Sequence, residues 1–530
     1  MSTSEKRLAV WYTREHFGEL CSALIEKLIT QTSLSLQDLT STKGVDSRNQ
    51  LKKSLCTLIQ HGVVDYKANS RGTIFYATRV RELLYRSRFT RYLEAVRTML
   101  GARGELVVAD VLQHGRVRIG DVMERVRERR EDGDERSVRE VDEETIEMCG
   151  KLIEMKMLFA PCRHVPPEVD EQGCAASVQS HNPFELPTAI TSFLQEKTNS
   201  TADSSQPAAK RRKLNQPITS KDTTPLQLDD GGIFYHLNFS QFHRHFLHQA
   251  IVGAVQQKVD PIASVIIKTI LSMTSSKPLE FQFGETTASV SSFELFQHLP
   301  AVPLLSRDEM NQYLSILTND STRFLIKVGE QGGGTYAINV GGMKETLCEQ
   351  TIESVVRERF GSRSLRVFRL LVAKKHLEQK QVGELAMIPA KESKELLYKL
   401  FVENFVTVQE IPRSGDHAPS RTFYLFTVNL EQVRRLLLTQ CYETAANLTS
   451  RRHVEMEKNE RLIEKSQRCE TIAETLRTSG NASKEDLAEV EEMMTPAEQQ
   501  QLERHRKTVK KLEQAELQLE DTIITLSKYE

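Results

Sequence analysis

The stretch 347–428 constrains the fold more than any other part of this sequence, because helical and strand-like patterns follow one another there in a fixed order. Apolar residues recur at helical spacing over 365–372, and again over 396–401 after Pro389, a residue that favours the first turn of a helix. Two runs rich in β-branched and aromatic residues follow, with the polar gap 412–419 between them. The pattern predicts three helices and then a β-hairpin. The core-facing stripe of the third helix is predicted to consist of Leu396, Leu397, Leu400 and Phe401.

This order is typical of a winged-helix domain, whose third helix enters the major groove when the domain binds duplex DNA. Here the third helix carries Lys391, Lys394 and Lys399 as candidate DNA contacts. Glu392 and Glu395 alternate with the first two lysines, and their negative charge weakens that interpretation. Winged helices also dock proteins, so we expect this domain to be a docking platform, with DNA contact shared by the assembled set of winged helices.

The beginning of the chain repeats the same order. A helix around 20–28 and a short helix over 34–42 precede a third helix, which Asp46 and Ser47 can cap. Two strands with a glycine-containing turn between them follow over 63–78. The candidate DNA contacts on this third helix are Arg48, Lys52 and Lys53.

Two further parts of the chain repeat the order more loosely. In 88–163 several helices lead into a short apolar strand, and we expect the mixed-charge run 129–139 to stay solvated. In 234–340 the last elements are again a helix, a strand, the glycines at 332–334 and a strand. Because no Lys-Ser/Thr pair follows these glycines, a wing turn is favoured over a phosphate-binding loop. The architecture repeats four times with little repetition of sequence.

The residues 430–530 show a different pattern, with charges of both signs and apolar residues seven positions apart. One seam runs over 462–476 and another over 502–526, where Glu516 interrupts it. The Thr-Pro-Ala-Glu sequence at 495–498 predicts a capping box at the start of a helix. Because neither arm holds a long uninterrupted heptad run, we expect an antiparallel helical hairpin.

The sequence therefore predicts a mainly α-helical protein with small β-hairpins, in which four tandem winged-helix domains precede a C-terminal antiparallel coiled-coil hairpin. The predicted parts are winged helix 1 at 1–86, winged helix 2 with its charged insertion at 87–163, a disordered linker at 164–229, winged helix 3 at 230–345, winged helix 4 at 346–429 and the hairpin at 430–530.

The predicted linker, 164–229, is rich in Pro, Ser, Thr, Gln and Asn and poor in aromatic residues. Such a segment buries too little apolar surface to offset the entropy lost on ordering. It contains a short basic cluster that resembles a nuclear import signal, with ordinary linker charge as the alternative. The cluster consists of Lys210, Arg211, Arg212 and Lys213.

The overall composition bounds the functional class. The formal net charge of -1 argues against a free-standing protein that coats nucleic acid, because such affinity comes mainly from Lys and Arg neutralising phosphates. The 8 cysteines include no CxxC pair, so they favour a reducing compartment over a zinc ribbon or a disulfide framework. No apolar run approaches the length of a membrane-spanning helix, and the N-terminus does not resemble a secretory signal.

The sequence holds no convincing catalytic or metal-binding constellation. His243, His245 and His248 lie close together, but no acidic or thiol residue stands at ligand spacing, so packing or surface roles are favoured. Cys162 and His164 lack a third group that would orient them for nucleophilic catalysis. We therefore expect no catalytic residue, no metal, no cofactor and no small-molecule substrate.

Two long runs resemble one family closely. The run RERFGSRSLRVFRLL that opens 357–405, and the run DHAPSRTFYLFTVN at 416–429, are similar to the winged-helix subunit of the RNA polymerase III-specific heterotrimer, which is related to the alpha chain of TFIIE. The part 164–229 matches this family least. Shorter stretches that support the resemblance lie at 14–20, 58–66, 242–255, 332–340 and 462–468.

The resemblance implies four extended winged helices and a coiled-coil hairpin, placed on the clamp of the largest polymerase subunit together with two smaller subunits. It implies a nuclear role in promoter opening and initiation on tRNA, 5S RNA and other small RNA genes, through promoter DNA and the polymerase III initiation factor. It also implies a part in cytosolic DNA sensing and innate immunity, because the enzyme transcribes AT-rich foreign DNA in the cytosol. Catalysis belongs to the two largest subunits, so no active-site residue is carried over.

Two other classes of protein use the same domain. A free-standing winged-helix DNA-binding regulator is disfavoured by the nearly neutral charge. A scaffold subunit of a proteasome-lid or initiation-factor type complex would carry one terminal winged helix after a helical solenoid, whereas here the hairpin pattern recurs four times. Affinity purification distinguishes these classes, because the recovered subunits differ.

Overall fold

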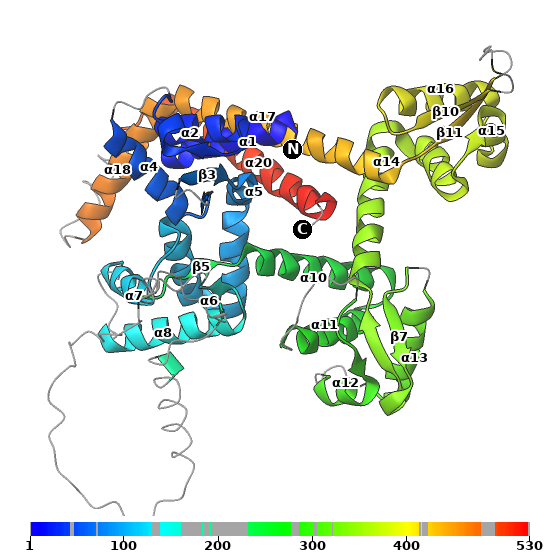
Figure 1. Ribbon diagram of the computed structural model, residues 1–530, viewed down its shortest axis with the longest axis horizontal. Helices are drawn as coiled ribbons and strands as arrows, with labels where there is room; N and C mark the ends of the chain where they lie inside the picture. Colours follow the sequence, from blue (N-terminus) through cyan, green and yellow to red (C-terminus); the bar gives the residue numbers. More distant parts are fainter. Residues whose placement is uncertain are drawn as a thin grey trace, which may run out of the picture. The chain divides into compact units, whose positions relative to one another are not determined.

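The computed structural model of the chain (Figure 1) is mainly helical with small antiparallel sheets, so the predicted fold class is confirmed. The chain divides into two compact units, Ala9–Ala250 and Ile251–Glu530 with Met1–Leu8, called here the N-terminal and the C-terminal unit. The structure describes residues 2–42, 47–69, 73–129, 138–160, 183–184, 190–191, 232–276, 286–299, 305–320, 322–412, 415, 422–478 and 493–527.

The first winged helix opens the N-terminal unit. Helix α1 (Thr3–Phe17) precedes it, and Gly18 separates α1 from the next helix because its φ of 86° is not helical. Ser35 caps one helix in a capping box, and Ser47 caps the third helix by accepting a hydrogen bond from the Gln50 N–H. Its strands pair antiparallel in the order β1-β3-β2. The elements are α2 (Glu19–Thr30), β1 (Leu34–Ser35), α3 (Leu36–Leu39), α4 (Arg48–Gln60), β2 (Val64–Ala68) and β3 (Ile74–Thr78).

The second winged helix completes the N-terminal unit. In its sheet Leu158 lies opposite Leu237, and Val117 forms an isolated bridge with Tyr235. The segment 235–237 therefore lies between its two neighbours, as β3 lies between β1 and β2. The elements are α5 (Val80–Leu84), a 3-10 turn (Tyr85–Arg88), α6 (Phe89–His114), α7 (Ile119–Glu128), α8 (Val138–Glu154), β4 (Leu158–Phe159) and β5 (His236–Leu237).

The pairing of β4 with β5 changes the place of 164–229 in the fold. The sequence predicted a linker between the second and third domains, whereas these residues stand between the two wing strands of the second winged helix. Tyr235, Leu237 and Phe242, which the sequence assigned to the third domain, are buried in the core of the second. Periodicity cannot show this arrangement, because β5 has only two residues and its partner precedes the whole segment. Most of 164–229 lies outside the described residues.

The third winged helix follows α10 (Phe239–Lys258). Its third helix begins with the capping box that Ser306 and Glu309 form, and its strands pair in the order β6-β8-β7. The glycines at 332–334 all have positive φ and join the last two strands, as a wing turn requires. The elements are α11 (Pro261–Ser276), β6 (Val290–Ser291), α12 (Ser292–His298), α13 (Arg307–Asn319), β7 (Leu325–Gly329), a 3-10 turn (Gln331–Gly333) and β8 (Thr335–Ile338).

The fourth winged helix repeats the arrangement with the sheet order β9-β11-β10. Gly361, with a φ of 85°, breaks its long first helix, as Gly18 separates the first two helices of the chain. Phe368, Leu397 and Phe405 are buried in one core. The elements are α14 (Val340–Lys374), β9 (Leu377–Glu378), α15 (Gln379–Ala386), α16 (Ala390–Val402), β10 (Thr407–Pro412) and β11 (Thr422–Thr427).

The third helices of the four domains, α4, α8, α13 and α16, are each followed by a residue with positive φ and then by two buried apolar residues. At α4 the Val63 N–H donates to the Leu58 carbonyl at 3.0 Å, and at α16 the Phe405 N–H donates to the Leu400 carbonyl at 2.9 Å. This bond belongs to the Schellman motif, which fixes the angle between the helix and the following strand. The positive-φ residues are Gly62, Lys156, Arg323 and Asn404.

The chain ends in the predicted helical hairpin. Its first arm is α17 (Leu430–Lys458) continued by α18 (Glu460–Thr478), and its second arm is α20 (Pro496–Leu526). The arms are antiparallel, since Arg452 pairs with Glu516 and Lys465 pairs with Glu498 farther along the first arm. Thr495 and Glu498 form the predicted capping box. Leu526 lies in the core of the fourth winged helix, so the end of the hairpin stabilises that domain.

Candidate nucleic-acid and docking surfaces

Helix α4 brings together the three predicted DNA contacts of the first winged helix. Arg48, Lys52 and Lys53 are all exposed, while Leu51, Leu55 and Leu58 on the other side of the helix are buried. The helix contains no acidic residue, and within the described part of the chain none of the three cations forms an ion pair. Such a face can neutralise phosphates without repelling them.

Helix α16 presents a different face. Lys391, Lys394 and Lys399 are exposed as well, but large apolar side chains share their side of the helix. Tyr398 is 67% exposed and Phe401 is 44% exposed. The sequence predicted Phe401 as part of the core-facing stripe, and this was wrong, because Leu396, Leu397 and Leu400 already fill the core side. The exposed apolar residues are the ones that sequence reasoning missed.

The third helices of the other two domains carry little positive charge. Helix α8 has six carboxylates against Arg139 and Lys151, and α13 has Asp308 and Glu309 against Arg307. Phosphate contacts need a surplus of cations, so neither helix is suited to them. Among the four third helices, α4 therefore has the most favourable charge for DNA.

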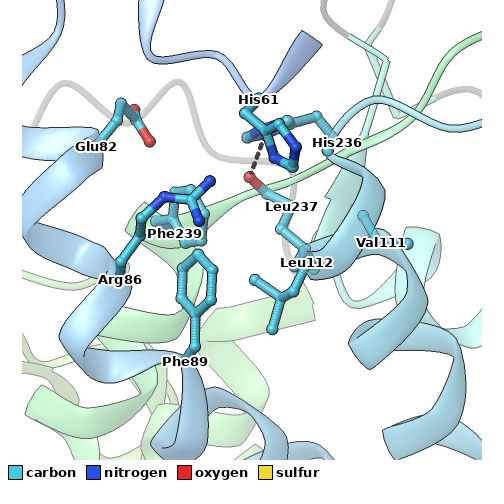
Figure 2. Close-up of a pocket in the computed structure, with 10 residues that line it drawn as sticks. His61, Glu82, Arg86, Phe89, Val111, Leu112, His236, Leu237 and Phe239 are labelled. Carbon is cyan, nitrogen blue, oxygen red and sulfur yellow. Dashed lines mark hydrogen bonds between the residues drawn. The ribbon is translucent and has the colours of Figure 1, made fainter. Parts of the chain in front are cut away.

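A small hollow, partly open to solvent, lies between the first and second winged helices (Figure 2). The Arg86 guanidinium lies over the Phe17 ring, 4.2 Å from its centroid, and burial lowers its pKa to about 10. Burial raises the pKa of Glu82 to about 7, and its Oε2 atom has no hydrogen-bond partner within the described residues. None of the sequence-predicted contact residues lines this hollow.

Two histidines also line the hollow. The Nδ1 atom of His236 lies 2.9 Å from the Leu237 carbonyl, the dashed contact in Figure 2. Burial lowers the pKa of both His61 and His236 to about 4, so both imidazoles are neutral near pH 7. The hollow is thus a packed junction with one carboxyl group and one guanidinium.

The remaining predicted residues have simpler outcomes. His243 is buried, with its Nε2 atom 2.8 Å from the Tyr92 hydroxyl, which confirms a packing role. No group of three or more His, Cys, Asp or Glu side chains suited to a metal ion occurs among the described residues. In the same part of the chain no helix is both long and apolar enough to cross a membrane. The basic cluster 210–213 lies outside the described residues.

Four family models of RNA polymerase III subunits match separate parts of the chain. The RNA polymerase III subunit RPC82 helix-turn-helix domain matches 8–69, and the RNA polymerase III subunit RPC82 family matches 164–343. The POLR3C C-terminal winged-helix domain matches 352–428, which is the domain that carries α16. The helical hairpin domain of DNA-directed RNA polymerase III subunit RPC3 matches 461–525.

Relatives from several vertebrates match the whole chain. The DNA-directed RNA polymerase III subunit RPC3 of Bos taurus is 38% identical, over 100% of this chain and 99% of its own length. The chain belongs to the RPC3 family of RNA polymerase III subunits. The proteins of the same name from Homo sapiens and Danio rerio are 37% and 38% identical, each over 100% of this chain and 98% of the relative. The family thus covers all four winged helices and the hairpin.

Proposed function

We propose that the chain is a non-catalytic subunit that works with two smaller subunits as a heterotrimer on the clamp of the largest polymerase III subunit. In this role it supports promoter opening and initiation on tRNA, 5S RNA and other small RNA genes, through the initiation factor and promoter DNA. The family membership and the tandem array of winged helices support this proposal, because such domains bind DNA and proteins rather than carry out chemistry. The proposal also includes a role in innate immunity, in which the polymerase transcribes AT-rich foreign DNA in the cytosol.

Purification of the tagged chain from nuclear extract tests this assignment. We expect the polymerase III core and two small subunits in amounts equal to the chain itself. Recovery of proteasome-lid or translation-factor subunits would contradict the proposal, and so would recovery of the chain alone, which the free-standing regulator predicts.

For the DNA contact, the observation that carries the proposal is the acid-free basic face of α4. Each phosphate that a lysine neutralises on duplex DNA makes the slope of log K against log salt more negative by about 0.9. The double substitution K52A/K53A is therefore expected to weaken DNA binding and to make that slope less steep by up to about 1.8. The matched control is K391A/K394A on α16, for which we expect little change. An unchanged slope for K52A/K53A excludes α4 as a phosphate contact.

The nucleus is the proposed location, and the basic cluster Lys210, Arg211, Arg212 and Lys213 is the proposed import signal. A cytoplasmic reporter fused to residues 200–220 is expected to accumulate in the nucleus. The matched control replaces the four basic residues by Gln. A reporter that stays cytoplasmic with the intact cluster contradicts the assignment.

A further inference from the structure

The solvent side of α16 carries more exposed apolar surface than folding of the domain requires. Met387, just before the helix, is 88% exposed, and Val402, in its last turn, is 54% exposed. Lys391, Lys394, Tyr398 and Val402 are spaced by three and four residues, so they form one stripe along the helix. We call Met387, these four residues, Lys399 and Phe401 the α16 face. Large apolar side chains that are exposed together on one side of a helix indicate a binding surface.

The charges of the α16 face are not balanced within the chain. Glu392, the nearest carboxylate to Lys391 in sequence, is already paired with the Arg363 guanidinium. Among the described residues Lys391, Lys394 and Lys399 form no ion pair, and Glu395 is the other acidic residue of α16 beside them. The face therefore has an apolar centre and an excess of positive charge beside it.

Duplex DNA is a poor occupant for this face. Base edges offer little apolar surface apart from the thymine methyl group, so Tyr398 and Val402 would gain little by insertion into a groove. The Glu395 carboxylate would also approach the phosphates. A protein partner can bury the apolar centre and satisfy the lysines at the same time.

We propose that the α16 face docks an amphipathic helix of another polymerase III subunit, whose apolar side covers Tyr398 and Val402 and whose carboxylates lie beside the three lysines. The proposal rests on the proposed function, since it places the partner within the polymerase. The stripe from Lys391 to Val402 spans about 17 Å at 1.5 Å per residue, the length of three helical turns. Ridges of side chains at i and i+4 on such a helix pack well against the same ridges on α16.

A photo-crosslinking amino acid in place of Tyr398 tests the proposal in the intact polymerase. The expected product joins this chain to a helical segment of another polymerase III subunit that has apolar residues on one side and Asp or Glu beside them. The matched control places the same amino acid at Ile316, which is 51% exposed on α13, the third helix of winged helix 3, and lies among fewer lysines. We expect no product of that kind from the control.

Three other products would overturn the proposal: a crosslink to promoter DNA, a crosslink to a second copy of this chain, or a crosslink to an acid-poor or non-helical segment. A polymerase that contains this chain but gives no crosslink at position 398 overturns it as well. The subunit composition of the purified sample is measured first. If the chain is missing from the polymerase, the proposed function fails, and that result is distinguishable from a failed docking site.

Substitutions that reverse or remove the charges of Lys394 and Lys399 test whether these lysines contribute to docking. K394E/K399E is expected to lower the crosslink yield at position 398 several-fold, and the neutral variant K394Q/K399Q is expected to lower it less. Lysine substituted for the acidic residues of the crosslinked segment should restore the yield for K394E/K399E. Equal yields for all variants would remove the electrostatic part of the proposal. Unchanged thermal unfolding of each variant confirms that the fold is intact.

Discussion

Helices α4 and α16 have the same position in two copies of one fold, and nearly all of their differences lie on the side that faces solvent. Both pack a leucine stripe into their domain, and both end in the same Schellman motif. The face of α4 has Arg48, Lys52 and Lys53 without an acidic residue, whereas the face of α16 has Tyr398 and Val402 among its lysines. The position of a helix in the fold therefore does not determine its partner, and the exposed side chains do.

The largest expected effect is a loss of stability, and it concerns the buried leucines that both helices have. Leu58 on α4 and Leu400 on α16 are both fully buried, so L58A and L400A each leave a cavity in the core. Each substitution is expected to lower the stability of its domain by about 2–5 kcal/mol. Hydrogen exchange of the amides of α4 and α16 measures the two losses separately. A cost below about 1 kcal/mol at one site only would break the equivalence of the two helices.

A second difference between the two helices is that a titrating group near α4 makes the stability there depend on pH. Near the end of α4 lies the Glu82 carboxyl group, whose pKa burial raises to about 7 from 4.5. Its favourable contribution is complete below pH 4.5 and is lost as the pH rises through 7, whereas a glutamine does not titrate. Relative to E82Q, the wild-type chain should thus lose about 1–3 kcal/mol of stability between pH 5 and pH 8.

Chemical unfolding of the wild-type chain and of E82Q at several pH values measures this difference. His61 and His236, whose pKa values are lowered to about 4, lose their favourable contribution as the pH falls below 6.5. Both proteins contain these histidines, so their effect cancels in the comparison. A constant difference between pH 5 and pH 8 would show that Glu82 is not protonated in the folded state.

The third prediction concerns a variant in which the charge of α16 resembles that of α4. The substitutions E395Q and Y398K together raise the net charge of the α16 face by two, because one removes a carboxylate and the other adds an ammonium group. If they create up to two new phosphate contacts, DNA affinity should rise by about fivefold per contact at physiological salt. The same variant should also lose the proposed docking partner. Fluorescence anisotropy with labelled duplex DNA measures the first effect, and unchanged DNA affinity would show that α16 cannot approach the backbone whatever its charge.

Much of this arrangement was predictable from local sequence. Ser47, Pro389 and Asn404 mark helix ends for known physical reasons, and the structure places helix ends at all three. The pairing of β4 with β5 was not predictable, because a two-residue strand has no periodicity and its partner is distant in sequence. Lys156 and Arg323 adopt positive φ without any local signal, since the packing of the following apolar residues imposes it.

The sequence did not show which side of α16 is exposed, and the reason is different. The run 396–402 is apolar on nearly all sides of the helix, so helical spacing does not show which residues face the core. Only the position of the other elements decides that Leu397 and Leu400 are buried and that Tyr398 is not. A sequence with apolar residues all round a short surface helix thus indicates a partner, although it does not identify the side that binds it.

The smallest expected effect provides the strictest test of the comparison. Y398S/V402S on α16 and K52A/K53A on α4 both alter exposed side chains, so each pair should change the free energy of unfolding by about 0.5 kcal/mol per site or less. Thermal unfolding of the isolated chain measures both. A loss of 2 kcal/mol or more in Y398S/V402S would mean that Tyr398 and Val402 pack against this chain itself. An unchanged stability would mean that folding does not require these apolar residues, which leaves binding as their function.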